Sequence, residues 1–302
     1  MHSKHIVSLV LLIMVIATLP VSIAQEDVDV LFDLSKEHDA TYGNPIVQSD
    51  RLCSSLADDG ITYGFIEEDE TLSLASLVRA RILVIWDPDE MYSSEEMEAV
   101  RAFVEQGGVL IFAGTSFFDT PSMVFDNINE LLDPFGIQMV HERVIDRTNF
   151  VGCHCGTTPV ATVFAPDSYF YNIEEIALSH SCYLEVEENV TVLVKGDDDA
   201  FVDKNNNEVH DEDEPQGDIP LIAQTVYGEG KVIVLPTEKT FERISIGRKD
   251  NMKFAVNLFG DLVSGSRPTE ESSIPIPYVV AGIAVIAVCG GAVVIFMRRH
   301  QK

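Results

Sequence analysis

The chain has 302 residues, of which 49 are acidic and 20 are basic. All the acidic residues fall between positions 26 and 271, where 16 basic residues leave a net charge of −33. Such a surface repels phosphate backbones and anionic lipid headgroups, so nucleic acid is excluded as a partner.

The first segment is a short apolar run that follows a weakly basic start. Residues 6–17 carry almost no polar side chain, and the small residues Ser22 and Ala24 stand where a signal peptidase cleaves. This pattern predicts a signal peptide over residues 1–24, with cleavage before Gln25.

The next part of the chain alternates apolar runs with helical spacing. Strands are predicted at 28–34, 62–66, 81–86 and 109–113, and helices at 47–57 and between Ser93 and Gly107. The runs RILVIW and VLIFA are nearly all apolar, which is typical of strands buried on both faces of a parallel sheet. The alternation predicts βαβ units, and therefore an α/β fold with a flavodoxin-like, mostly parallel sheet flanked by helices.

The second half has a less regular pattern. Strands are predicted at 137–141, 176–186, 190–195, 220–227 and 231–236, helices at 127–134 and 251–263, and a loop at 148–170. Gly228-Glu229-Gly230 is predicted to be a hairpin turn. Together with the first half, these elements define one domain over residues 25–264.

The last part of the chain has the length and charge pattern of a membrane anchor. Residues 274–297 contain no charged side chain, and three basic residues follow within 298–302. A run of this length spans a bilayer as a helix, with the basic tail on the cytoplasmic side. We therefore expect a single-pass protein of the cell membrane: an extracellular domain, a polar stalk (265–273), a transmembrane helix (274–297) and a short cytoplasmic tail (298–302).

Several of these segments together resemble a known family. They are VLFDLSKEH at 30–38, ARILVI at 80–85, YSSEE at 92–96, FVEQGGVLI at 103–111, YGEGKVIVL at 227–235 and Asp250-Asn251 before the last helix. Their order resembles the class I glutamine-amidotransferase-like fold, in particular the non-catalytic branch seen in DUF4350 proteins and in the N-terminal domain of intraflagellar-transport protein 52. The resemblance implies an amidotransferase-like α/β domain over about residues 28–263.

The catalytic residues of that superfamily are missing from the matching positions. Active members place a Cys nucleophile on the turn where Gly114-Thr115-Ser116 stands here, and a His-Pro-Glu where this chain has Pro236-Thr237-Glu238. A serine nucleophile would need an adjacent base and a G-x-S-x-G elbow, which is absent. The sequence therefore predicts that the protein is not an enzyme.

A calcium loop is predicted within an acidic insertion at 197–218. Oxygen-bearing side chains stand at loop positions 1, 3, 5, 9 and 12, and position 7 offers a backbone carbonyl. In order, the predicted calcium ligands are Asp203, Asn205, Asn207, Val209, Asp211 and Glu214. Position 6, Glu208, lacks the usual Gly, and the alternative is a charged surface loop kept extended by repulsion.

Four cysteines lie in the predicted extracellular domain, namely Cys53, Cys153, Cys155 and Cys182. In an oxidising compartment they predict disulfides, with Cys182 bound to one of the pair 153/155 and Cys53 to the other. The alternatives are a zinc or copper site that includes His154 and His180, and free thiols. Asn189 begins an Asn-x-Thr glycosylation sequon.

Polar residues follow several predicted strands and indicate a ligand crevice. The candidates are Asp33, Ser35, Asp87, Thr115 and Ser116. Ligands bind at the carboxyl ends of strands in open α/β sheets, although Asp87-Pro88 is also an ordinary turn signal.

Two functions are compatible with this sequence. The first is a non-catalytic, membrane-anchored domain for protein interaction or ligand sensing, with an unidentified protein partner and a structural Ca²⁺ ion. The second is a cell-surface hydrolase or a carbohydrate-binding protein that uses the crevice at the strand ends. A component of a surface-assembly complex is a third possibility by analogy with the fold alone.

Overall fold

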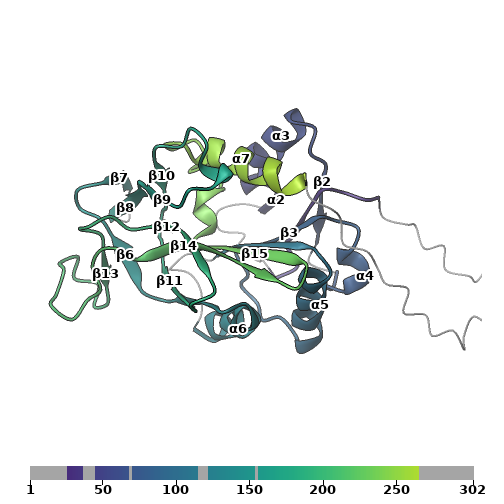
Figure 1. Cartoon of the computed structure of the whole chain (residues 1–302), viewed down its shortest axis with the longest axis horizontal. Coiled ribbons are helices and arrows are strands. Elements are labelled where there is room, and N and C mark those ends of the chain that lie inside the picture. The colour runs from purple at the N-terminus through teal and green to yellow at the C-terminus, as the bar shows by residue number, and fades with distance from the viewer. Residues whose placement is uncertain (1–25, 37–44, 68–69, 115–121, 154–155, 265–302) are drawn as a thin grey trace, which may run out of the picture.

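An eight-stranded mixed sheet forms the centre of the computed structural model, which describes residues 26–36, 45–67, 70–114, 122–153 and 156–264 (Figure 1). Its strands, from edge to edge, are β2 (Tyr63–Ile66), β1 (Val30–Asp33), β3 (Ile82–Trp86), β4 (Val109–Ala113), β15 (Gly230–Leu235), β14 (Pro220–Tyr227), β12 (Thr191–Lys195) and β9 (Val163–Phe164). Neighbours from β2 to β15 are parallel, and neighbours from β15 to β9 are antiparallel. The predicted α/β fold is confirmed, and an antiparallel half extends the parallel sheet.

Helices cover both faces of the sheet because its central strands are apolar on both sides. The elements on one face are α2 (Pro45–Gln48), α3 (Asp50–Asp58) and α7 (Asn251–Val263), and those on the other are α4 (Leu74–Leu77), α5 (Ser94–Glu105) and α6 (Ser122–Leu132) (Figure 1). Successive residues of β1 alternate between the two cores: Val30 and Phe32 belong to the core that includes α7, and Leu31 belongs to the core that includes α5.

The start and end of α5 follow the sequence signals. The Ser93 hydroxyl accepts a hydrogen bond from the backbone N–H of Glu96 at 3.2 Å, and the Glu96 carboxylate accepts one from the N–H of Ser93 at 2.9 Å. This capping box satisfies two N–H groups that the first helical turn leaves free. At the other end Gly107 has φ +105°, and a Cβ on Gly108 would clash with the ring of Phe103.

The predicted elements of the first half and the last helix are confirmed, but two predictions in the second half are wrong. Residues 148–170 are not a loop, because they form β7 (Phe150–Cys153), β8 (Gly156–Ala161), β9 and the 3₁₀ helix η2 (Ser168–Phe170). The strand predicted at 176–186 divides into β10 (Ile176–Ala177) and β11 (Tyr183–Val186). His180, between them, has φ +57°, which breaks the extended backbone.

Further short strands form a β lobe beside the sheet (Figure 1). β10, β8 and β7 form a three-stranded sheet, β5 (Ile137–Val140) pairs with β11, and β6 (Arg143–Ile145) pairs with β13 (Phe201–Asp203). The lobe reaches the carboxyl ends of the parallel strands, where the Thr237 hydroxyl donates to the carbonyl of Ser179 at 2.7 Å. Two 3₁₀ helices complete the domain: η1 (Asp133–Phe135) and η3 (Glu238–Thr240).

The two ends of the described chain lie close together. Arg79 donates to the carbonyl of Glu26, and Arg81 donates to the carbonyl of Val263. Both arginines precede β3, so both chain ends lie at the amino ends of the parallel strands. The predicted signal peptide, stalk, transmembrane helix and tail lie outside the described residues. In the part that is described, no helix has the length and hydropathy needed to cross a membrane.

Candidate functional site

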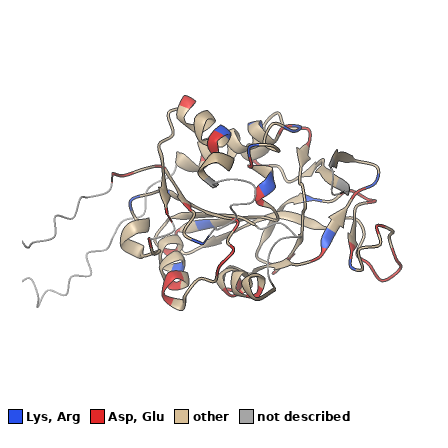
Figure 2. Ribbon diagram, turned by 180° about the vertical axis from the view of Figure 1, so that it is seen from behind, with Lys and Arg blue, Asp and Glu red and all other residues tan. Residues whose placement is uncertain are grey.

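The predicted calcium loop projects from the β lobe, at the end of the molecule opposite the chain ends (Figures 1 and 2). Its base is hairpin-like, because Phe201 bridges to Gln216 and the N–H of Val202 donates to the carbonyl of Pro215 at 2.9 Å. Pairing of β13 with β6 fixes this base to the rest of the lobe. Figure 2 shows that acidic residues follow one another along the loop.

The first and last predicted ligands organise the loop backbone. The Asp203 carboxylate, 1% exposed, accepts hydrogen bonds from the N–H groups of Asn207 (3.0 Å) and Glu208 (3.1 Å). The Glu214 carboxylate accepts from the N–H groups of Lys204 (2.8 Å) and Asp211 (2.9 Å). The two carboxylates that would carry most of the negative charge around a cation are therefore already held in place by the backbone.

The remaining predicted ligands lie in the same network. The side-chain amides of Asn205 and Asn207 both donate to the Asp211 carboxylate, at 2.7 and 2.8 Å. The side-chain carbonyl of Asn207 accepts from the N–H of Val209 at 2.7 Å. At position 6, Glu208 makes the sharp turn with φ +60°, a conformation that usually takes Gly. The predicted ligands thus lie in one hydrogen-bonded loop, but the carboxylate oxygens of Asp203, Asp211 and Glu214 do not all come within 4.8 Å of one another.

Two arginines contact this loop from β6 and the residues after it. The Arg143 guanidinium lies 2.6 Å from the Asp203 carboxylate and 3.6 Å from that of Glu208. Arg147 donates to the Glu208 carbonyl and lies 3.9 Å from its carboxylate. The sequence analysis missed both arginines, because about 60 residues separate them from the loop and only the pairing of β6 with β13 brings them there.

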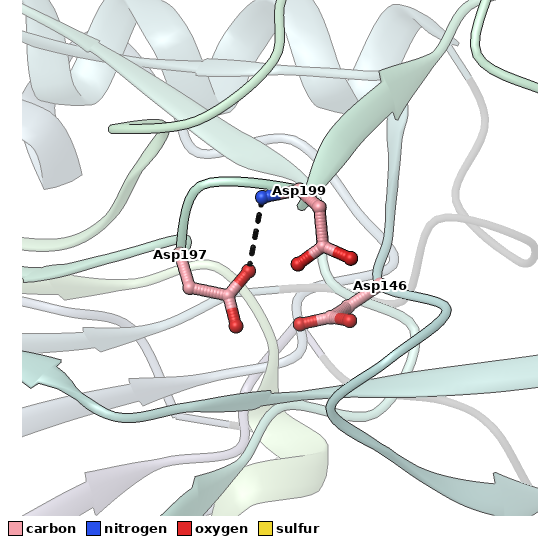
Figure 3. Close-up of side chains that lie close together, drawn as sticks. All are labelled: Asp146, Asp197 and Asp199. Carbon is pink, nitrogen blue, oxygen red and sulfur yellow. Dashed lines mark hydrogen bonds between the residues drawn. The ribbon is translucent and has the colours of Figure 1, made fainter.

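A second acidic cluster lies at the other end of the β6–β13 pair. Carboxylate oxygens of Asp146, Asp197 and Asp199 lie within 4.8 Å of one another (Figure 3). The Asp197 carboxylate accepts a hydrogen bond from the N–H of Asp199 at 3.4 Å. The Asp146 carboxylate accepts hydrogen bonds from the N–H groups of Thr148 and Asn149. Burial, and next the charge of Asp146, raises the pKa of Asp197. Three carboxylates this close can hold a cation or share a proton.

The raised pKa of Asp197 predicts that its charge destabilises the fold at neutral pH. The native state binds the Asp197 proton more tightly than the unfolded state, so stability falls as the pH rises from about 4 through the raised pKa. Because water screens this partly exposed carboxylate, Asp197→Asn should raise the free energy of unfolding by less than about 1 kcal/mol in chelator at pH 7, and the gain should shrink near pH 4. Denaturant unfolding at both pH values measures this effect. Asp198→Asn, at an exposed neighbour, is the control and should be nearly neutral; a stability loss in Asp197→Asn at pH 7 would contradict the argument.

Two of the five strand-end candidates, Asp33 and Ser35, are buried. Asp33, 1% exposed, accepts hydrogen bonds from the N–H of Ser35 (3.0 Å) and the hydroxyl of Tyr92 (2.7 Å). Burial raises the pKa of Asp33, and these hydrogen bonds oppose the rise. Ser35 is also buried, and Asp87 is partly exposed with φ +41°. Thr115 and Ser116 lie outside the described residues.

An ion cluster that the sequence analysis missed follows β15. The Glu238 carboxylate is 1% exposed and lies 2.7 Å from the Lys239 ammonium, which is 3.4 Å from Glu242. Burial raises the pKa of Glu238, and the charge of Lys239 opposes the rise. Burial alone would lower the pKa of Lys239, but the charges of Glu238 and Glu242 raise it. The Glu that the amidotransferase resemblance indicated is therefore paired with a lysine.

The two predicted disulfide cysteines with described side chains are buried on different faces of the sheet and are not bonded to each other. Cys53 packs in the core that includes α7, and Cys182 packs in the core that includes α5. Burial raises the pKa of both thiols, that of Cys53 to about 11. Pairing of either with Cys153 or Cys155 stays a prediction, because the sulfur atoms of those two lie outside the described part. Asn189 is exposed between β11 and β12, where a glycan would meet no obstacle from the core.

Comparison with protein families identifies the domain. A family model described as "Domain of unknown function (DUF4350)" matches residues 52–259, more than half of the chain. The chain belongs to the DUF4350 family. The resemblance to DUF4350 proteins that the sequence predicted is therefore confirmed. No curated protein is significantly similar to this DUF4350 chain in sequence.

Among the solved structures that are similar to this DUF4350 domain are the two that follow. The "mmIFT52 N-terminal domain" has a TM-score of 0.63 and 16% sequence identity, over 78% of this chain and 98% of that chain. The "Cytoplasmic Protein STM1381 from Salmonella typhimurium LT2" has a TM-score of 0.52 and 15% identity, over 78% of this chain and 99% of that one. The structural similarity to the N-terminal domain of intraflagellar-transport protein 52 is thus confirmed, and at these identities it concerns the fold alone.

Proposed function

We propose that this DUF4350 protein is a non-catalytic, membrane-anchored extracellular domain of the amidotransferase-like fold that binds a protein partner and contains a structural calcium loop. The observation that supports the calcium loop is that its six predicted ligands lie in one loop whose side chains and backbone are joined by hydrogen bonds. The partner is unidentified.

The donor set fits calcium by its chemistry. The groups that would hold the ion are the side chains of Asp203, Asn205, Asn207, Asp211 and Glu214 and the carbonyl of Val209, all of them oxygen donors. Hard oxygen ligands suit Ca²⁺, and the ion would offset the repulsion between the loop carboxylates. The left-handed backbone at Glu208 supplies the turn that the missing Gly normally makes.

The strand ends support a non-catalytic role. Both Asp33 oxygens accept hydrogen bonds from within the protein, and Glu238 is neutralised by a lysine rather than oriented by a histidine. Among the described residues, Asp33 is hydrogen-bonded inside the fold and Glu238 is buried against a lysine, whereas a hydrolase would present an acid or base to its substrate. The alternative of a hydrolase or carbohydrate-binding protein therefore has less support.

The positions of the chain ends favour one orientation on a membrane. If residues 274–297 span the bilayer, the anchor continues from the end of α7, at the amino ends of the parallel strands. The calcium loop then lies at the far end of the molecule (Figure 1). A partner approaching from outside would meet this end first.

Calcium titration of the purified full-length protein tests the proposal. With millimolar affinity, 10 mM CaCl₂ should stabilise the fold by about 1–1.5 kcal/mol and raise Tm by about 3–6 °C. Asp203→Asn should abolish the shift, whereas Asp213→Asn makes the same change of charge at an exposed residue outside the ligand set and should retain it. If the wild-type Tm does not respond to calcium, or if both variants lose the response equally, the calcium loop is disproved.

A further inference from the structure

Arg143 is fixed opposite the first predicted calcium ligand by the backbone. In the β6–β13 ladder, Arg143 pairs directly with Asp203, and its guanidinium lies 2.6 Å from the carboxylate. Arg143 is 8% exposed and Asp203 is 1% exposed, so little water separates or screens the pair. This contact does not depend on a flexible surface side chain.

We infer that Arg143 is a built-in counter-ion of the calcium loop. The arginine competes with the bound cation for the Asp203 carboxylate and so keeps the affinity of the loop for calcium low. This inference rests on the proposed calcium loop. A cation bound to Asp203 would share that carboxylate with the guanidinium, and the two positive charges would repel each other. The arginine therefore weakens binding of calcium without being a ligand itself.

Arg143 and Arg147 together supply the loop with positive charge. Arg143 is paired with Asp203 and also lies near Glu208, and Arg147 lies near the carboxylate of Glu208 as well. These contacts supply positive charge to a loop that otherwise contains many carboxylates.

Arg147 offers a matched control for Arg143. Its side chain is 54% exposed and contacts Glu208, which is not a predicted ligand. Exposed ion pairs contribute little, whereas removal of one partner from a buried pair leaves an uncompensated charge. The variants R143Q and R147Q remove the same charge from the same short segment, but only R143Q releases Asp203.

Calorimetric titration with CaCl₂ and thermal melts in chelator test the inference on the full-length chain. R143Q should bind calcium about tenfold more tightly than the wild type. Its Tm in chelator should be lower than that of the wild type, and calcium should raise its Tm by more. R147Q should change the affinity less than twofold. Unchanged or weaker calcium binding by folded R143Q would overturn the role of Arg143 but leave the calcium loop in place. Absence of calcium binding in the wild type and in both variants would disprove the calcium loop itself.

The inference about Arg143 can still be tested if R143Q has a folding defect. If the variant is unfolded in chelator, calcium should restore the folded state once RT ln(1 + [Ca²⁺]/Kd) exceeds the loss of folding free energy. R143K, which keeps the charge near Asp203, should then remain folded in chelator and bind calcium as weakly as the wild type. Failure of calcium to restore R143Q, or tight binding by R143K, counts against the inference.

Discussion

Replacement of Lys239 by Met should cost about 3–5 kcal/mol of unfolding free energy at pH 8. The substitution leaves the Glu238 carboxylate buried without its cation, and neither of its oxygens accepts a hydrogen bond within the described structure. A methionine fills a similar volume, so the lost charge accounts for most of the effect. Lys249→Met removes a more exposed ion pair with Glu175 and should cost less than 1 kcal/mol.

The loss in Lys239→Met should depend on pH. Burial already raises the pKa of Glu238, and without Lys239 that pKa rises further, so the native state holds the proton to higher pH. Because a protonated Glu238 needs no counter-ion, the cost should be smaller at pH 5 than at pH 8. Urea unfolding at both pH values measures the difference, and addition of Glu238→Gln should recover much of the loss at pH 8. Equal losses at the two pH values would refute the explanation.

Replacement of Asn251 by Ala should cost about 3 kcal/mol. The side chain of Asn251 is fully buried at the start of α7, and it accepts from the N–H of Ala177 at 2.8 Å and donates to its carbonyl at 2.9 Å. It also donates to the carbonyls of Thr240 (3.3 Å) and Ser245 (3.4 Å). Its removal would leave several buried backbone groups without partners, and each such group costs about 1–3 kcal/mol.

Asn257→Ala provides the comparison within the same helix. Asn257 is only partly buried, and its amide donates to the carbonyls of Tyr169 and Tyr171, which water can reach more easily after the substitution. We expect a cost of about 1 kcal/mol for this variant. Chemical denaturation of both variants, with equal m-values, measures the loss of unfolding free energy in each. A cost for Asn251→Ala no larger than that for Asn257→Ala would show that Asn251 does not join α7 to β10.

The parallel half of the fold was predictable because local signals there agree with the tertiary structure. β3 and β4 are short apolar runs, and α5 has a capping box at one end and two glycines at the other. The β lobe was less predictable, since its strands are short and held by partners far away in the chain. β8, for example, pairs with β7 and β10, and nothing in its own residues, which include Pro159, indicates a strand.

The residues of the candidate site also divide into those that the sequence could predict and those that it could not. The calcium loop was visible because all its predicted ligands lie within twelve consecutive residues. Arg143, the Asp146–Asp197–Asp199 cluster and the pair of Glu238 with Lys239 were missed, since charge pairing across strands and burial of an acid follow from tertiary structure. The burial of Asp33 likewise depends on the neighbouring Tyr92, 59 residues away.

The closeness of residues 26 and 264 has a consequence for the connectivity of the domain. Since both ends lie beside the segment before β3, a short linker between them would close the chain into a ring without crossing the sheet. The ring could then be opened at the exposed turn around Asn189, between β11 and β12, with every strand pairing retained. The architecture is therefore suited to circular permutation, and it would fit into a surface loop of another protein as a single inserted unit.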